Sequence, residues 1–208
     1  MKNEVVEAYF DPVACVTQEE RRERIVALVK AVDRLLTQLD IDYWLDSGTL
    51  LGQFREQNVM LWDNDADIGI TSAGYEKLRG LKVPVDVPDG YKLQVYDSEL
   101  YDTDDRDANI PVRLVDTRFG FYVDGFVFHE AVVNDVEVLS TAASVSWHTC
   151  AKCLRVGTYE ALLVITKAYV FPLIACDFAD FRVVCPAQRT LYLDHLYGSD
   201  FRIPKPRH

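Results

Sequence analysis

Three aspartates, Asp63, Asp65 and Asp67, occupy alternate positions in the run Trp62-Asp63-Asn64-Asp65-Ala66-Asp67. In a strand, Asp65 and Asp67 point to one face, and the residues between and after them point into the core. Two carboxylates on one face repel each other unless a cation lies between them, and magnesium prefers such oxygen ligands. An exposed acidic edge is the alternative, but apolar residues flank and interleave with these acids. The spacing therefore predicts a magnesium (or manganese) site on Asp65 and Asp67, with Asp63 in a supporting catalytic role.

A third carboxylate is needed if the site is to hold a pair of metal ions. Asp124 is the best candidate, because it interrupts an otherwise apolar predicted strand. A lone acid in such a strand is unfavourable without a partner, and Gly125 beside it is expected to leave room for a ligand. Asp116 is a weaker alternative, because it lies at the turn from Asp116 to Gly120, just before that strand. We therefore assign Asp124 to the metal site together with the aspartate pair.

A turn leading into a helix lies upstream of the aspartates. Gly48 and Thr49 follow a short predicted strand and precede a predicted helix. Glycine lets the backbone approach a phosphate closely, while the helix N-terminus and the Thr49 hydroxyl are donors to its oxygens. A plain turn is the alternative for this pair. Arg55 and Arg113 are candidates to add positive charge beside a phosphate, and a structural ion pair explains either arginine equally well.

Taken together, these segments resemble a known family. The blocks are Tyr43-Trp44-Leu45-Asp46-Ser47-Gly48-Thr49-Leu50-Leu51-Gly52, Arg55, Trp62-Asp63-Asn64-Asp65-Ala66-Asp67-Ile68-Gly69 and the closing Tyr192-Leu193-Asp194-His195-Leu196-Tyr197-Gly198 with Pro204. Their order resembles the LicD family of the nucleotidyltransferase superfamily, which includes bacterial phosphocholine transferases, fukutin and fukutin-related protein. The likeness extends from about Asp40 to Pro204. Asn64 replaces a frequent aspartate of the family, and it is expected to face away from the aspartate pair.

The resemblance implies a reaction and a set of roles. It implies a LicD-like phosphotransferase that moves a phosphoalcohol, such as phosphocholine or ribitol phosphate, from a CDP-linked donor to a hydroxyl of a glycan or small-molecule acceptor. Gly48 and Thr49 would contact phosphate, and the aspartates would hold magnesium. Two alternatives stay open: a nucleotidyltransferase acting on a small molecule or protein, and a non-catalytic metal- or nucleotide-binding module.

The chain contains five cysteines, Cys15, Cys150, Cys153, Cys176 and Cys185. An odd number, without an evident export signal, argues against a disulfide framework. Cys150 and Cys153 have the spacing of half a zinc site, which Cys176 and Cys185 would complete. The second pair is spaced more widely than zinc sites usually are, so buried free cysteines are the more common explanation.

The composition limits the partners. The 208 residues carry a net charge of −11 and a pI near 4.8. Such a protein repels nucleic acid, and a nucleotide would need a metal to bridge it to the protein. No segment approaches the roughly 18 apolar residues that span a membrane, and the first residues do not resemble a signal peptide. We expect a cytoplasmic protein by default, while family analogy leaves the secretory pathway open.

Periodicity predicts an α+β fold, a mixed β-sheet flanked by helices, in one domain over 1–208. A capping box from Thr17 to Glu20 opens a helix at 17–40. A catalytic core is expected over about 41–140, with strands at 41–45, 66–70, 91–96, 112–116, 121–128 and 135–139. A helical part is expected over about 141–208, with helices at 159–169 and 187–197 and a strand at 181–184.

Overall fold

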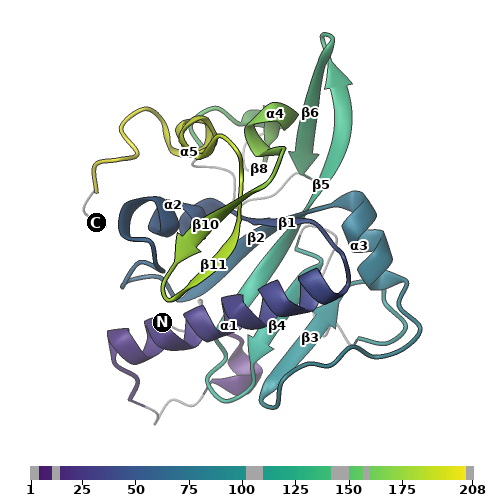
Figure 1. The fold of residues 1–208 in the computed structure, drawn as a ribbon, viewed down its shortest axis with the longest axis vertical. Coiled ribbons are helices and arrows are strands. Elements are labelled where there is room, and N and C mark those ends of the chain that lie inside the picture. Colours follow the sequence, from purple (N-terminus) through teal and green to yellow (C-terminus); the bar gives the residue numbers. More distant parts are fainter. Residues whose placement is uncertain (1–4, 11–14, 102–109, 142–149, 157–159, 205–208) are drawn as a thin grey trace.

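A mixed sheet forms the centre of the molecule in the computed structural model, which describes residues 5–10, 15–101, 110–141, 150–156 and 160–204 (Figure 1). Its main path is β1-β2-β5-β4-β3, and β6 and then β9 extend it beyond β5. β2 and β5 run parallel, and the other neighbours are antiparallel. The strands are β1 (Tyr43–Leu45), β2 (Asp65–Thr71), β3 (Tyr91–Val95), β4 (Val112–Asp116), β5 (Tyr122–Val133), β6 (Val136–Thr141) and β9 (Val164–Thr166).

Helices cover this sheet, and two small hairpins accompany it. The helices are η1 (Glu7–Tyr9), α1 (Gln18–Gln38), α2 (Ser47–Glu56), α3 (Ser72–Arg79), α4 (Lys167–Val170) and α5 (Arg189–Tyr197). The hairpins are β7 (Leu154–Val156) with β8 (Glu160–Leu162), and β10 (Ile174–Phe178) with β11 (Phe181–Cys185). The predicted α+β class, a mixed sheet flanked by helices, is confirmed. In the described residues, no helix is both long and apolar enough to cross a lipid bilayer.

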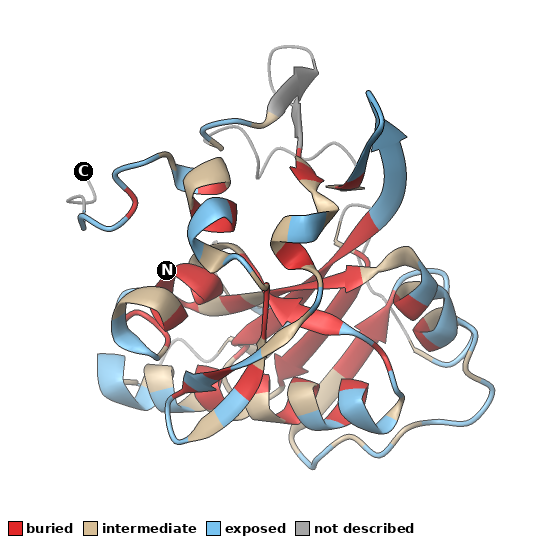
Figure 2. Ribbon diagram, turned by 45° about the horizontal axis from the view of Figure 1, so that its top comes forward, coloured by how far each residue is buried: buried red, intermediate tan, exposed pale blue. Residues whose placement is uncertain are grey.

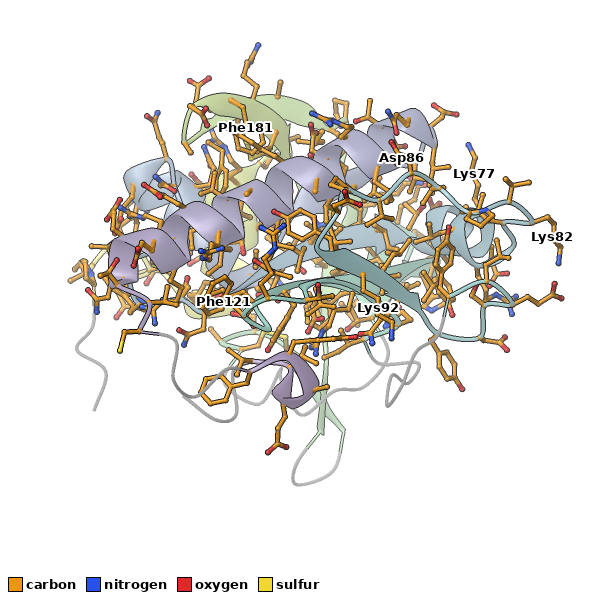
Figure 3. All side chains as sticks on the ribbon, turned by 90° about the horizontal axis from the view of Figure 1, so that it is seen from below. Lys77, Lys82, Asp86, Lys92, Phe121 and Phe181 are labelled. Atoms are coloured by element: carbon orange, nitrogen blue, oxygen red, sulfur yellow. A yellow bond between two sulfur atoms is a disulfide. The ribbon has the colours of Figure 1, made fainter. Side chains whose placement is uncertain are left out.

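Helix α1 covers one face of the sheet. Thr17 and Glu20 form the predicted capping box: each side chain bonds the backbone N–H of the other. Eight buried residues then recur at helical spacing: Ile25, Val26, Leu28, Val29, Ala31, Val32, Leu35 and Leu36. In Figure 3 α1 lies across the sheet, between Phe181 of β11 and Lys92 of β3. Each buried leucine or isoleucine contributes roughly 1.5–3 kcal/mol, so this contact holds the sheet in place.

The long strand β5 has two different halves. Its first residues, from Tyr122 to Phe128, are buried in the centre of the sheet, and the rest are exposed. Among the described strands the exposed half pairs with β6 alone, and this hairpin projects from the body of the protein (Figures 1 and 2). Asn134 and Asp135 form its turn with positive φ angles, as short hairpin turns require. The buried half is therefore the part that can position a site.

The segment after β6 differs from the prediction. The helix expected at 159–169 is wrong: the chain forms β8, β9 and only a short α4 there. An apolar run of this length fits a helix or buried strands equally well, and Val164, Ile165 and Thr166 are β-branched. Pairing of Leu139 in β6 with Ile165 decides for the strand. The described residues beyond 141 thus combine two helices with five strands, so this part is not mainly helical.

Candidate active site

A cavity of about 340 Å³ opens on the face of the sheet opposite α1. β2, β4 and β5 form its floor, the start of α2 and the end of α5 form its walls, and Cys150 and Ile110 complete it. Its lining residues are Ser47, Gly48, Asp65, Asp67, Ile110, Arg113, Tyr122, Asp124, Phe126, Cys150, Leu196 and Tyr197. It therefore brings together six of the candidate residues from the sequence: Gly48, Asp65, Asp67, Arg113 and Asp124 of the phosphate and metal site, and Cys150 of the possible zinc site.

Strand alternation brings the aspartates into the cavity. Asp65 and Asp67 line it, while Ala66 and Ile68 are 0% and 1% exposed on the opposite face. The parallel register sets Asp67 beside Asp124 of β5. Side chains paired in register point to the same face of a sheet. The predicted set of three carboxylates thus shares one surface.

Asp124 has the partner that its buried position demands. Arg113 lies opposite it in the antiparallel register of β4 and β5. The Arg113 Nε donates to Asp124 Oδ1 at 2.6 Å, and its Nη2 donates to Oδ2 at 2.7 Å. The guanidinium also lies 3.6 Å above the centre of the Tyr122 ring. The sequence left two roles open for Arg113, a contact with phosphate or a structural ion pair. The structure contains the ion pair, in the wall of the cavity.

The carboxylates change the acidity of their neighbours. Burial first, and then the negative charges of Asp65, Asp124, Asp46 and Asp63, raise the pKa of Asp67 well above its usual range. Each of these groups favours the protonated form of Asp67. A cation placed beside Asp67 would remove this penalty, so the cavity has the electrostatics of a cation-binding site.

The first turn of α2 reaches the cavity through an unusual backbone. Ser47, the first helical residue, has φ of +46°, which is uncommon for a residue other than glycine and stores strain. The carboxylate of Asp46 caps this helix by accepting from the Ser47 N–H at 2.7 Å. In the described structure, neither the Gly48 nor the Thr49 N–H donates a hydrogen bond. Gly48 lines the cavity, so its amide is available to an anion at the helix N-terminus, whereas Thr49 is buried behind it.

Asp46 is buried behind this turn and was not among the predicted site residues. It is 0% exposed, and the Tyr192 hydroxyl of α5 donates to its Oδ1 at 2.7 Å. Its Oδ2 has no partner within the described residues. Burial raises the pKa of Asp46 to about 6, against the hydrogen bonds from Tyr192 and Ser47. The sequence analysis placed Gly48 and Thr49 before the helix, whereas the helix begins at Ser47, so the capping role of Asp46 was missed.

Thr49 and Arg55 lie outside the cavity lining. The buried Thr49 hydroxyl accepts from the Asp67 N–H at 2.8 Å and so joins α2 to β2. Arg55 donates to the carbonyls of Phe201 and Ile203, just after α5. Arg55, one of the residues quoted for the family resemblance, thus contacts the segment between Gly198 and Pro204 at the end of the domain.

Three other predicted positions lie around the cavity or away from it. A Cβ added to Gly48 would lie 3.6 Å from Asp63 Oδ2, which places Asp63 beside the α2 turn. Asp116 is buried at the end of β4, where it accepts from the Arg118 N–H at 2.8 Å, outside the cavity. The expectation that Gly125 leaves room for a ligand is wrong, because it faces the α1 side, and a Cβ there would lie 3.0 Å from Val112.

Whether the cavity can bind a metal ion depends on which of its carboxylates are able to act as ligands. In the described ranges, no three His, Cys, Asp or Glu side chains form a group able to hold a metal ion. Asp124 does not join Asp65 and Asp67 in such a group, because both of its oxygens accept hydrogen bonds from Arg113. Asp65 and Asp67 share one face of β2 and fit one hard cation with further oxygen ligands from a substrate. The residues thus fit a metal on the pair, while a cage of three carboxylates is not formed.

The cysteines depart from the expected zinc site. Cys150 is disulfide-bonded to Cys153, and Cys176 to Cys185 across the β10–β11 hairpin. Zinc needs thiolates, and sulfurs in disulfides are not thiolates. In this structure the four-cysteine site is therefore not formed, and the expectation of no disulfides is wrong. Cys15 is free and exposed.

Several cavity residues escaped the sequence analysis. Tyr122 and Phe126 lie two residues either side of Asp124, so strand alternation alone puts them on its face. Leu196 and Tyr197 belong to the closing block Leu196-Tyr197-Gly198, whose resemblance to the family was the available signal. Ile110 comes from a loop, and no local pattern places it.

The fold and the site define a class before any comparison. A mixed sheet with an aspartate pair on one strand, facing a helix N-terminus across a cavity, is the arrangement of a nucleotidyltransferase-like domain. A family model described as LicD/FKTN/FKRP, nucleotidyltransferase domain, matches residues 40–188. The chain belongs to this family.

Relatives in several organisms support the assignment. The chain is 24% identical to the ribitol-5-phosphate transferase FKTN of Homo sapiens over 190 residues, which is 88% of this chain and 34% of that protein. It is 44% identical to an uncharacterised protein of Rickettsia typhi (strain ATCC VR-144 / Wilmington) over 52 residues, 25% of this chain and 17% of that protein. The chain thus spans about a third or less of the length of these relatives.

Proposed function

We propose that this chain is a divalent-cation-dependent transferase that moves a phosphoalcohol from a CDP-linked donor to a hydroxyl of a glycan or small-molecule acceptor. Ribitol phosphate and phosphocholine are the candidate groups. The observation that carries the proposal is the position of Asp65 and Asp67 in one cavity with the Gly48 turn of α2. An acidic pair alone would bind a cation, and a helix N-terminus alone would bind an anion. Both together suit a diphosphate with its metal.

Each residue has a role in this proposal. The Gly48 amide binds a phosphate of the donor, with Thr49 behind it in the same helix turn, while Asp65 and Asp67 would hold magnesium or manganese. A bound divalent cation would neutralise charge on the diphosphate and on the departing nucleotide. The acceptor oxygen forms a bond to the phosphorus that carries the alcohol, the bridging P–O bond breaks, and CMP leaves. Asp63, beside the turn, is the candidate to take the hydroxyl proton or to orient the acceptor.

Donor cleavage by the purified chain tests this proposal. We expect release of CMP from CDP-ribitol or CDP-choline with magnesium, and a fall of roughly 10²–10³-fold in Asp65→Asn and Asp67→Asn, because each change removes a ligand of the cation that stabilises charge on the diphosphate. Asp86→Asn is the matched control, because Asp86 is an exposed carboxylate outside the cavity. Undiminished turnover in both cavity variants would contradict the proposed mechanism.

Ligand-induced stabilisation separates this proposal from its two alternatives. A protein that binds a CDP-alcohol melts at a higher temperature in its presence, by mass action. We expect stabilisation by CDP-ribitol or CDP-choline with magnesium. Stabilisation by nucleoside triphosphates alone would favour nucleotide transfer. Stabilisation without any donor cleavage would favour a binding module.

A further inference from the structure

Arg113 has a position that the family resemblance did not assign. Its guanidinium is fixed on two sides, by both oxygens of Asp124 and by the ring of Tyr122. Arg113 and Asp124 are 9% and 4% exposed, yet both line the acidic cavity. A planar guanidinium that pairs with a carboxylate in this two-pronged way is well ordered and permanently charged.

We propose that Arg113, and not a second metal ion, supplies the second positive centre of this cavity, so that the site binds a single divalent cation at Asp65 and Asp67. This inference rests on the proposed function, because it assumes that the aspartate pair takes a metal. It differs from the expectation drawn from the sequence, in which Asp124 was a third metal ligand.

Electrostatic repulsion is the first argument. The two ions of a two-metal site lie roughly 3.5–4 Å apart and share carboxylates. A divalent cation on Asp124 would lie within a few ångströms of the Arg113 guanidinium, which contacts both Asp124 oxygens. Like charges at such distances repel strongly where water is largely excluded. Arg113 therefore opposes a metal at the carboxylate that a second ion would need.

Charge balance is the second argument. The described lining of the cavity contains three carboxylates, Asp65, Asp67 and Asp124, and the guanidinium of Arg113. One divalent cation together with Arg113 balances the three carboxylates of this lining, while Asp46 and Asp63, which also act on Asp67, lie outside it. The donor would then meet two positive centres, one mobile and one built into β4. Arg113 lines the cavity beside Asp124, so it can face a phosphate without leaving its partner.

Counting bound Mn²⁺ tests the inference without an activity assay. Electron paramagnetic resonance of free Mn²⁺, with CDP present, gives the number of ions per chain. We expect one ion on the wild type and one on Asp124→Asn, with a weaker affinity in the variant because the charge of Arg113 is then no longer offset by Asp124. Two ions on the wild type, or loss of binding in Asp124→Asn, would overturn the inference and leave the proposed function standing. No ion on the wild type would overturn the metal dependence itself.

Removing the arginine gives the complementary result. In Arg113→Met, Asp124 loses its built-in cation, and we expect a second Mn²⁺ to bind, with the broadened spectrum of two neighbouring ions. Arg113→Met/Asp124→Asn is the matched control and should return to one ion. A single ion in Arg113→Met, in protein whose circular dichroism is unchanged, would overturn the competition between arginine and metal.

Discussion

The two faces of the central sheet differ in the kind of side chain they bury, although these side chains come from neighbouring residues. On β2, Ala66 and Ile68 face α1 and are almost fully buried, whereas Asp65 and Asp67 face the cavity. The α1 face gains stability from apolar burial. The cavity face gathers like charges that raise the pKa of Asp67. The comparison teaches that apolar burial and a cluster of like charges are separated here by a single step along one strand, so substitutions on the two faces change stability for different physical reasons.

Breaking the Arg113–Asp124 ion pair on the cavity face should give the largest change in stability. In metal-free protein we expect Arg113→Met to lower the free energy of unfolding by roughly 3–5 kcal/mol, because it removes the guanidinium that pairs with both oxygens of the buried Asp124 carboxylate. Urea denaturation in EDTA measures this. Arg113→Met/Asp124→Asn should recover most of the loss. A double variant as unstable as the single one would mean that Arg113 acts by packing on Tyr122 instead.

Two adjacent residues of β2 provide the sharpest contrast between the faces. Ile68→Ala should lower the free energy of unfolding by about 3 kcal/mol, as large-to-small changes in a core do. Asp67→Asn should raise it in metal-free protein at neutral pH, because it removes a carboxylate held among four others. The same urea experiment compares them. If Asp67→Asn were destabilising to a similar degree, the cavity face would be a packing surface after all.

Sequence reasoning succeeded where a local pattern determines the answer. The capping box at Thr17 and the alternation of Asp65 and Asp67 both follow from short-range geometry. It failed in the apolar run around Ile165, which becomes a strand only because β6 is there to pair with it. It also left open the role of Arg113, which depends on the register of β4 against β5.

The walls of the cavity were the least predictable part. Leu196 and Tyr197 reach it from the far end of the chain, and Cys150 from a loop whose disulfide the cysteine count argued against. Such contacts depend on packing between distant segments, and no spacing in the sequence encodes them. The alternation rule, applied to β5 as well as β2, would have found Tyr122 and Phe126.

The buried carboxyl of Asp46, on the cavity side of the sheet, should make the stability of the protein depend on pH. Its pKa is raised to about 6 in the folded protein, so the folded state binds its proton more tightly than the unfolded state does. The free energy of unfolding of metal-free protein should therefore fall as pH rises from about 4 to about 6, by roughly 2–3 kcal/mol from this group. Asp67, shifted in the same direction, adds to the decline.

A pair of variants isolates the contribution of Asp46. In Asp46→Asn the new side-chain amide oxygen can still accept from the Tyr192 hydroxyl and the Ser47 N–H, but the group cannot ionise. This variant should therefore flatten the decline and be the more stable protein at pH 7. Asp86→Asn, at an exposed carboxyl, should leave the profile unchanged. Urea denaturation at a series of pH values in EDTA measures all three. An unaltered slope in Asp46→Asn would show that Asp46 stays ionised when buried, with the Tyr192 and Ser47 hydrogen bonds outweighing its loss of water.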